Sequence, residues 1–390
     1  MKILRQFITG ITLTALVFSC REAYTPPQIT ANSNYLVVEG LINTGTDSTI
    51  FKLSRTVRLY AKTTTQNETH AIVTVESDAN AVYPLKEITP GTYASAALGL
   101  SKTAKYRLRI IANTNTHTTY LSDFTAGKDS PLIDSLGYNI EPNGLQVYVN
   151  AHDATNNTRY YRWDYVETWE FHPMFDSQYV ADQNGTACCA VRTPAQDVFT
   201  CWHTSASTDL VLASSAKLTQ DVIYNTIITT VPSASEKVSV GYSIFVKQYA
   251  LTLDAFNFWQ NLKKNTELLG SIFDAQPSEI QGNIHNITDS TEPVFGYISA
   301  GTSQQKRITV FYTSWPQGWG QDKSAYNNCL KDTILNKDIA IFLGGAPNQI
   351  PLEKYYIPPF PAPQGYVGSS RNCADCTLRG TNIKPSFWPL

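Results

Sequence analysis

Residues 160–171 alternate between apolar and polar side chains more regularly than any other part of the chain. One set of alternate positions is aromatic and the other polar: Tyr161, Trp163, Tyr165, Trp169 and Phe171 against Arg162, Asp164, Thr168 and Glu170. Successive side chains of a strand point to opposite faces of a sheet, so this segment predicts one long strand with a buried aromatic face. Core packing is the first interpretation of that face, and stacking against a sugar is the alternative.

Short β-branched runs precede this strand and are separated by turn residues such as Pro90-Gly91. They are Tyr35–Val38, Ile50–Leu53, Ala71–Val75, Tyr106–Ile111 and Thr118–Leu121. Many short strands at such spacing are typical of a sandwich or a small barrel, and we expect an N-terminal β-sandwich over residues 34–126.

A second series of strands, Ile133–Tyr138, Gly144–Val149, residues 160–171 and Val238–Tyr249, predicts a second sandwich over 130–330. Apolar residues at helical spacing predict one amphipathic helix over about 254–269, with Thr252 as N-cap and Gly270 just past its end. Residues 331–390 are rich in proline and predict a tail held by disulfides. The expected fold is mainly β, with two tandem immunoglobulin- or fibronectin-like sandwiches, one helix and this tail.

The N-terminus has the pattern of an export signal. Lys2 and Arg5 precede an apolar run over residues 8–18, which ends at Ser19-Cys20. The run is shorter than the roughly 20 residues that span a bilayer. We therefore expect a lipoprotein signal peptide over 1–20, lipid attachment at Cys20, a tether over 21–33 and a location at the outer membrane, on its surface or its periplasmic face. Cleavage by an ordinary signal peptidase is the alternative.

The chain has seven cysteines, and removing Cys20 leaves an even number. The disulfide candidates are Cys188, Cys189, Cys201, Cys329, Cys373 and Cys376. Adjacent cysteines rarely bridge each other, so Cys188 and Cys189 should reach different partners, one of them Cys201. Zinc held by Cys373 and Cys376 with Cys201 and His203 is a weaker alternative. We expect no metal and no cofactor apart from the covalent lipid.

Charge and motif content argue against several functional classes. A formal net charge of −2 without a basic run disfavours nucleic-acid binding. The sequence contains no nucleophile, phosphate-loop, dinucleotide or zinc-protease motif. Glu167 and Glu170 fall on opposite faces of the predicted strand, so they cannot form a glycosidase pair. We therefore predict no catalytic residues and no enzymatic activity.

Trp315 and Trp319 lie in a Pro/Gly-rich loop, Trp315-Pro-Gln-Gly-Trp319-Gly. Aromatic side chains on such a loop are expected to be at least partly exposed and often contact a ligand or a partner protein. The alternative is that the loop folds back as a lid on the sandwich. We take both tryptophans as candidate contact residues.

Several segments in this order resemble one uncharacterised family of Bacteroidota outer-membrane lipoproteins, a domain of unknown function. They are Tyr35–Gly40, Tyr161–Trp163 with Glu167–Trp169, Tyr242–Gln248, Gly270–Asp274 with Gln276-Pro277, Gly282-Asn283, and Cys373–Thr377 with Lys384–Trp388. The resemblance spans nearly the whole mature chain. It implies a lipoprotein often encoded beside TonB-dependent receptors, and it brings no catalytic residues.

The resemblance leads to one expected function and one alternative. The first is a non-catalytic binding or accessory subunit of a TonB-dependent transporter, with the bilayer and the receptor as partners. The second is a surface-exposed structural or adhesive lipoprotein, because β-sandwiches serve as spacers as readily as they serve as receptors.

Overall fold

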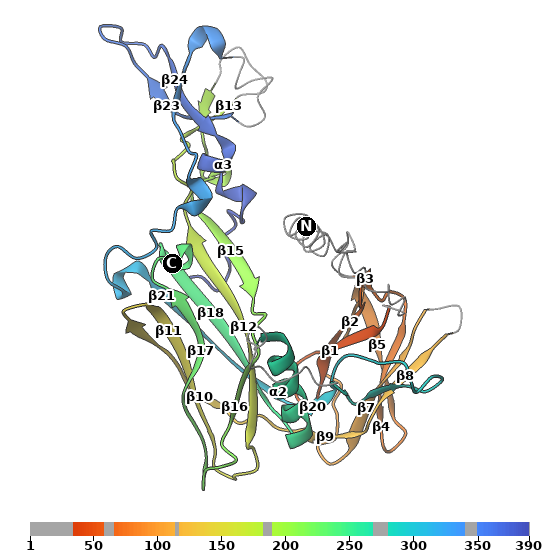
Figure 1. Ribbon diagram of the computed structural model, residues 1–390. Coiled ribbons are helices and arrows are strands. Elements are labelled where there is room, and N and C mark those ends of the chain that lie inside the picture. The colour runs from red at the N-terminus through yellow and green to blue at the C-terminus, as the bar shows by residue number, and fades with distance from the viewer. Residues whose placement is uncertain are drawn as a thin grey trace, which may run out of the picture.

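The computed structural model describes residues 34–57, 66–113, 117–181, 189–267, 280–339 and 349–389. The lipobox Cys20, the tether and Cys188 therefore lie outside the described residues. Figure 1 shows three β-rich parts: a barrel, a unit of two sheets, and an extension that continues from one end of that unit. No helix within the described ranges is both long and apolar enough to cross a membrane.

The N-terminal strands form a closed barrel and not the expected sandwich. In ring order its strands are β7 (Lys105–Ile111), β4 (Ile72–Ser77), β5 (Val82–Thr89), β6 (Thr92–Ser95), β2 (Thr49–Arg55), β1 (Leu36–Asn43), β20 (Ser299–Gly301) and β9 (Thr125–Lys128). β9 pairs back to β7 and closes the ring. β8 (Thr119–Ser122), β19 (Ile284–Asn286) and β3 (Gln66–Asn67) pair outside it. The expected tandem of two sandwiches is therefore wrong for this part.

The barrel also corrects the predicted boundaries, because its last strand comes from far along the sequence. β20 pairs parallel to β1 on one side and parallel to β9 on the other. Ile284, Ile298 and Ala300 are buried in the same core as Leu36 and Val38. The barrel is thus built from two separate stretches of chain, and residues 130–330 are not one continuous domain.

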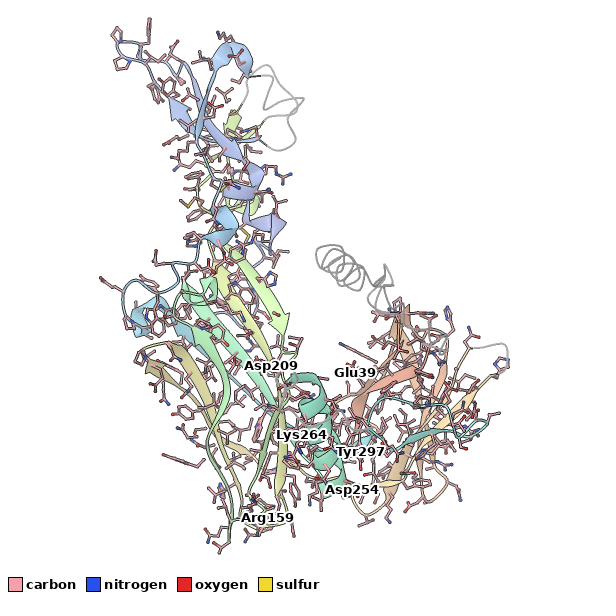
Figure 2. All side chains as sticks on the ribbon, viewed as in Figure 1. Glu39, Arg159, Asp209, Asp254, Lys264 and Tyr297 are labelled. Carbon is pink, nitrogen blue, oxygen red and sulfur yellow. A yellow bond between two sulfur atoms is a disulfide. The ribbon has the colours of Figure 1, made fainter. Side chains whose placement is uncertain are left out.

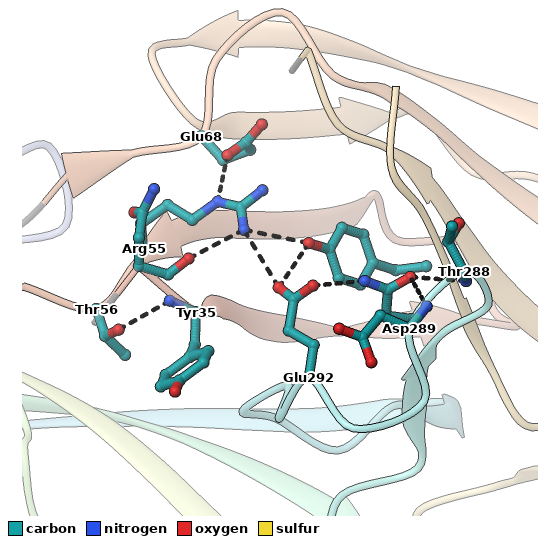
Figure 3. A network of polar contacts seen from close by, with 10 residues as sticks. Tyr35, Arg55, Thr56, Glu68, Thr288, Asp289 and Glu292 are labelled. Carbon is teal, nitrogen blue, oxygen red and sulfur yellow. Dashed lines mark hydrogen bonds and ion pairs between the residues drawn. The ribbon is translucent and has the colours of Figure 1, made fainter. Parts of the chain in front are cut away.

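A buried polar network ties the late stretch to the early strands (Figure 3). Arg55 on β2 donates to Glu68 at 2.6 Å and to the Tyr120 hydroxyl at 3.2 Å, and that hydroxyl donates to Glu292 at 2.9 Å. Burial disfavours the charged guanidinium, but the hydrogen bonds and charges of Glu68 and Tyr120 together outweigh it and raise the pKa of Arg55. Removing one partner from such a network leaves a buried charge uncompensated, which destabilises strongly.

The barrel and the two-sheet unit are joined by two crossings of the chain that lie side by side. β9 leads into β10 through Ser130, and β20 leads into β21 through Thr302. The backbone N–H of Ser130 donates to the Thr302 hydroxyl at 2.9 Å, and that of Thr302 donates to the Lys128 carbonyl at 3.2 Å. The Gln248 amide, buried in the two-sheet unit, donates to the Pro131 carbonyl at 2.8 Å. The two crossings therefore brace each other.

The two-sheet unit consists of sheets that pack face to face over one core. The smaller sheet has the order β10 (Ile133–Glu141), β11 (Gly144–Asp153) and β17 (Asp221–Pro232). The larger has β15 (Cys201–Ala206), β12 (Tyr160–Phe171), β18 (Gly241–Ala250) and β21 (Ser303–Phe311), with β16 (Val211–Ser214) beside β12. β12 has the predicted bounds, and Tyr161 and Trp163 on its aromatic face are fully buried in the shared core. The core interpretation of that face is confirmed for these rings.

The predicted helix is α2 (Leu253–Glu267), and it lies between the larger sheet and the barrel (Figures 1 and 2). The Thr252 hydroxyl accepts from the Ala255 N–H at 3.2 Å, as its predicted N-cap role requires. Phe256 packs on Tyr160 of the sheet, and Phe258 on Tyr297 of the late barrel stretch. Leu269 and Gly270, at the predicted end, lie outside the described residues.

The C-terminal residues are folded and are not an extended tail. β22 (Asp332–Leu335), β24 (Gly365–Ser370) and β23 (Gln349–Tyr355) form a sheet, followed by α3 (Arg371–Ala374) and the short 3-10 helix η7 (Cys376–Leu378). The insertion between β12 and β15 contributes β13 (Tyr179–Ala181) and β14 (Cys189–Val191). Phe175 and Val198 of the insertion pack with Ile350 and Leu352 of β23. The proline-rich composition obscured a sheet that is completed by an insertion distant in sequence.

Disulfides fasten the extension, as expected, but with a different pairing. Cys201 on β15 bonds to Cys376, and Cys329 bonds to Cys373. Cys201 is therefore not the partner of an adjacent cysteine, although Cys189 is also disulfide-bonded. Because Cys201, Cys373 and Cys376 are all oxidised, they cannot supply the thiolates of the zinc alternative.

Asp153 at the end of β11 gives the first prediction. Its carboxylate accepts from the backbone N–H groups of Thr155, Asn157 and Thr158 at 2.9, 3.0 and 2.8 Å. Burial would raise its pKa, but the hydrogen bonds from Thr155 and Thr158 outweigh this and lower the pKa to about 2. A depressed carboxyl pKa stabilises the fold above the ordinary carboxyl pKa, and this is lost as pH falls toward 2.

We expect Asp153→Asn to lower the free energy of unfolding by about 1 kcal/mol at pH 7, after allowance for solvent screening. The difference from wild type should shrink between about pH 4 and pH 2, in urea unfolding followed across this range. Asp47→Asn, in the exposed turn after β1, is the matched control. A destabilisation that does not change with pH would contradict the electrostatic origin.

The disulfide between Cys201 and Cys376 gives the second prediction. It joins β15 to η7, at the end of the extension nearest the larger sheet, across a sequence separation of 175. The double variant Cys201→Ser, Cys376→Ser should lose about 2–4 kcal/mol of stability, seen as a lower Tm, and should be cut first within 329–389 by a protease. Ser205→Ala, half-buried on the same strand, is the control. An unchanged Tm and cleavage pattern would show that packing alone holds the extension.

Candidate ligand site at the end of the two-sheet unit

The Trp315–Gly320 loop folds onto the end of the two-sheet unit. Trp315 is only 8% exposed and packs in the shared core, so the expectation that it is exposed is wrong. Trp319 is partly buried and stacks on it, with ring centroids 6.4 Å apart. The Gly320 N–H donates to the Ser233 carbonyl at 2.8 Å, and a Cβ at Gly320 would lie 2.3 Å from the Ser239 Cα. The loop therefore folds back as a lid on the two-sheet unit, as the alternative interpretation expected. A contact role for either tryptophan stays a prediction.

Close to this lid, where the extension meets the larger sheet, lies a hollow of about 500 Å³. Its walls are Trp169, Phe171, His203, Glu236, Leu378 and Arg379. Trp169 on β12 and His203 on β15 are register partners, so their rings lie on the same face of the sheet with centroids 4.6 Å apart. The hollow is thus lined by the last residues of the aromatic face of β12.

An ion pair between Arg379 and Glu236 lies at the rim of the hollow. Both terminal nitrogens of Arg379 lie 2.8 Å from the Glu236 carboxylate, and one also donates to the Tyr326 hydroxyl at 2.6 Å. Burial acts to lower the pKa of Arg379, but the hydrogen bonds and charges of Glu236 and Tyr326 together outweigh it and raise that pKa. The His203 ring bonds to the Arg379 carbonyl through Nδ1 at 2.5 Å. These bonds fix the segment after η7 against β15.

A second paired carboxylate lies under the Trp169 ring. Glu167, which is buried, accepts from Lys237 at 2.6 Å and from the Tyr242 hydroxyl at 2.8 Å. Burial, followed by the charge of Glu167, raises the pKa of Tyr242 well above its ordinary value, so the phenol stays a neutral donor. The Lys237 ammonium lies 5.2 Å from the Trp169 ring centroid, a cation–π distance. Glu170, on the opposite face, accepts from the Trp388 indole at 3.1 Å.

The hollow and its surroundings combine flat rings with paired charges. Glu236 at the rim and Glu167 nearby are both held in ion pairs. Flat rings beside planar polar groups are the usual lining of sites for small ligands that have both apolar and polar faces. Within the described ranges, no three His, Cys, Asp or Glu side chains gather as a metal site.

Sequence reasoning found two walls of this site, because Trp169 and Phe171 were both part of the predicted aromatic face. Glu236 and Arg379 carried no signal. The pairing of Cys201 with Cys376 could have located Arg379, because it brings the residues after Cys376 next to His203 on β15.

The far end of the extension carries a second exposed feature, the loop between β23 and β24. Residues 356–362 are all exposed. Tyr356, Ile357 and Phe360 are 51%, 38% and 57% exposed, respectively. In Figure 1 this hairpin points away from both the two-sheet unit and the barrel.

Comparison with known proteins identifies a family for this chain. Residues 21–307 match a family described as Domain of unknown function (DUF4249). None of the curated proteins matches the chain. Among solved structures, the two-fibronectin type III domain segment from chicken tenascin is 12% identical and covers 55% of this chain and 90% of that one. Its TM-score is 0.16, so this likeness carries no argument.

The match confirms the resemblance to a domain of unknown function, with one correction to its extent. It ends within β21, so the extension and the segments Cys373–Thr377 and Lys384–Trp388 lie outside it. It includes the barrel strands, α2 and most of the two-sheet unit. Because the matched residues make up well over half of the chain, the protein belongs to the family described as domain of unknown function DUF4249.

Proposed function

We propose that this protein is a lipid-anchored outer-membrane protein that acts as a non-catalytic binding or accessory subunit of a TonB-dependent transporter. The signal-like N-terminus with Cys20 supports the anchor. The resemblance to Bacteroidota lipoproteins encoded beside TonB-dependent receptors supports the transporter partner. Two or three acyl chains at Cys20 would hold the protein on the bilayer far more firmly than one.

The observation that carries the binding role is the hollow between β12, β15 and the segment after η7. It joins aromatic walls, Trp169 and His203, to a planar polar pair, Arg379 and Glu236. Such a site favours a small ligand with an apolar face and several hydroxyls, of which a neutral sugar is the simplest example. The rings stack on the apolar face, and the paired charges hydrogen-bond to the hydroxyls.

A structural or adhesive role is the second candidate, and the arrangement in Figure 1 is the observation that favours it. The extension continues from the end of the two-sheet unit opposite the barrel junction and is fastened by disulfides. A protein of this shape could hold a contact surface away from its anchor without binding any small molecule.

The third prediction tests the hollow. Intrinsic fluorescence and calorimetry with a panel of neutral oligosaccharides should reveal binding to wild type, and Trp169→Ala should weaken it at least tenfold, because the stacking surface is lost. Tyr224→Ala removes an aromatic ring that is 81% exposed on β17 and serves as the control. A cooperative unfolding transition checks that Trp169→Ala remains folded, although its Tm should fall because the ring packs against the core. Absence of binding to wild type, or equal binding by both variants, would contradict a sugar site here.

The fourth prediction tests anchor and partner together. The tagged protein, extracted with mild detergent from native outer membranes, should co-purify with a TonB-dependent receptor in a stoichiometric amount. Cys20→Ala should release the protein from the membrane fraction, because the acyl chains are lost. Recovery of wild type without a receptor would remove the transporter role and favour the structural or adhesive one.

A further inference from the structure

The exposed loop of the extension has an unusual composition for a surface loop. From Tyr355 to Gln364 there is no charged residue, and four positions are proline. Loop tips are normally polar because they face water. Several large apolar side chains gathered on one exposed tip therefore indicate a contact surface.

The loop is held in one shape by its backbone. The Phe360 N–H donates to the Ile357 carbonyl at 3.0 Å. At the base of the loop, between the end of β23 and the start of β24, the Gln364 N–H donates to the Tyr355 carbonyl at 2.8 Å. The Asn336 side chain, at the start of the short helix η5 (Asn336–Asp338), donates to the Pro363 carbonyl at 3.0 Å. Prolines restrict the remaining backbone, so little conformational entropy is lost when such a loop binds.

The charges at the base of the loop help to identify the kind of surface that the loop contacts. Glu353 and Lys354 on β23 carry opposite charges, as do Lys337 and Asp338 on η5. Glu353 is further paired with Lys331 at 3.0 Å, and Asp332 follows Lys331 at the start of β22, so three lysines stand beside three carboxylates. Surfaces that bind anionic membranes gather an excess of lysine and arginine around their apolar residues, and this balanced base has none. The charge pattern favours a protein partner over a lipid surface.

The hydrogen bond from Phe360 to Ile357 makes the loop a tight turn and not an extended proline helix. Large aromatic side chains held on such a rigid turn act in protein interfaces as anchors that fill apolar pockets of the partner. The loop offers Tyr356 and Phe360 as anchors on either side of Pro358-Pro359, and its base is an ordered sheet. It therefore has the chemistry of the inserted element, and the partner would supply the groove.

We propose that the loop of residues 355–364 docks into an uncharged, apolar groove on the extracellular or periplasmic surface of the transporter protein. This inference rests on the proposed function, since it names the surface through which the subunit contacts its partner. The hollow lies at the other end of the extension, so docking at the tip leaves the ligand site open.

The fifth prediction tests this surface by replacing its two anchors. Tyr356→Ser, Phe360→Ser should reduce recovery of the TonB-dependent receptor at least tenfold, because aromatic anchors at the centre of an interface each contribute more than about 1 kcal/mol. The control is Val82→Ser, Ile88→Ser on β5, which removes side chains that are 58% and 60% exposed on the barrel. Both variants should keep the wild-type Tm, since all four side chains are exposed.

The outcomes separate this inference from the proposed function. Loss of the receptor with the tip variant alone supports the docking loop. If wild type and tip variant recover the receptor equally, the loop is not the contact, although the transporter role stands. If wild type recovers no receptor, the proposed function itself fails and this inference with it. Flotation of the unlipidated protein with phosphatidylethanolamine–phosphatidylglycerol vesicles, lost in the tip variant, would overturn the inference in favour of a membrane contact.

Discussion

The pair of crossings at Ser130 and Thr302 determines how the rest of the molecule is arranged. The chain leaves the barrel after β9 and returns to it as β20, and a single residue then separates β20 from β21 of the two-sheet unit. Hydrogen bonds between the two crossings and to Gln248 leave little freedom for one part to swing against the other. α2 fills the space beside this junction, with one aromatic ring on each neighbour.

The predictable part of the fold is the part that is specified by local pattern. The alternation in residues 160–171 gave the bounds of β12. Thr252 marked the start of α2 because capping is a local interaction. Each of these signals lies within a few residues of the structure that it specifies.

The remainder depends on contacts between distant segments. β20, Ser299–Gly301, contains no strongly β-forming residue and is a strand only because β1 and β9 lie on either side of it. The hollow unites His203 with Arg379 across a sequence separation of 176. The extension combines an insertion with the C-terminal sheet, and no periodicity in either segment reveals the other. A single sequence reveals composition and the periodicity of apolar residues, but it does not reveal which distant segments pair with each other.

Closure of the barrel by a late strand also sets an order on folding. Ser130 and Thr302 are 172 residues apart in sequence, and every strand of the two-sheet unit except β21 lies between them. Contacts at such separation form slowly, because the intervening chain must first become compact. Until β20 arrives, β1 and β9 each have a free edge that could pair with another chain. Because a chain is synthesised N-terminus first, the first part to emerge is thus among the last to be completed, and a chaperone that covers strand edges would protect it during that interval.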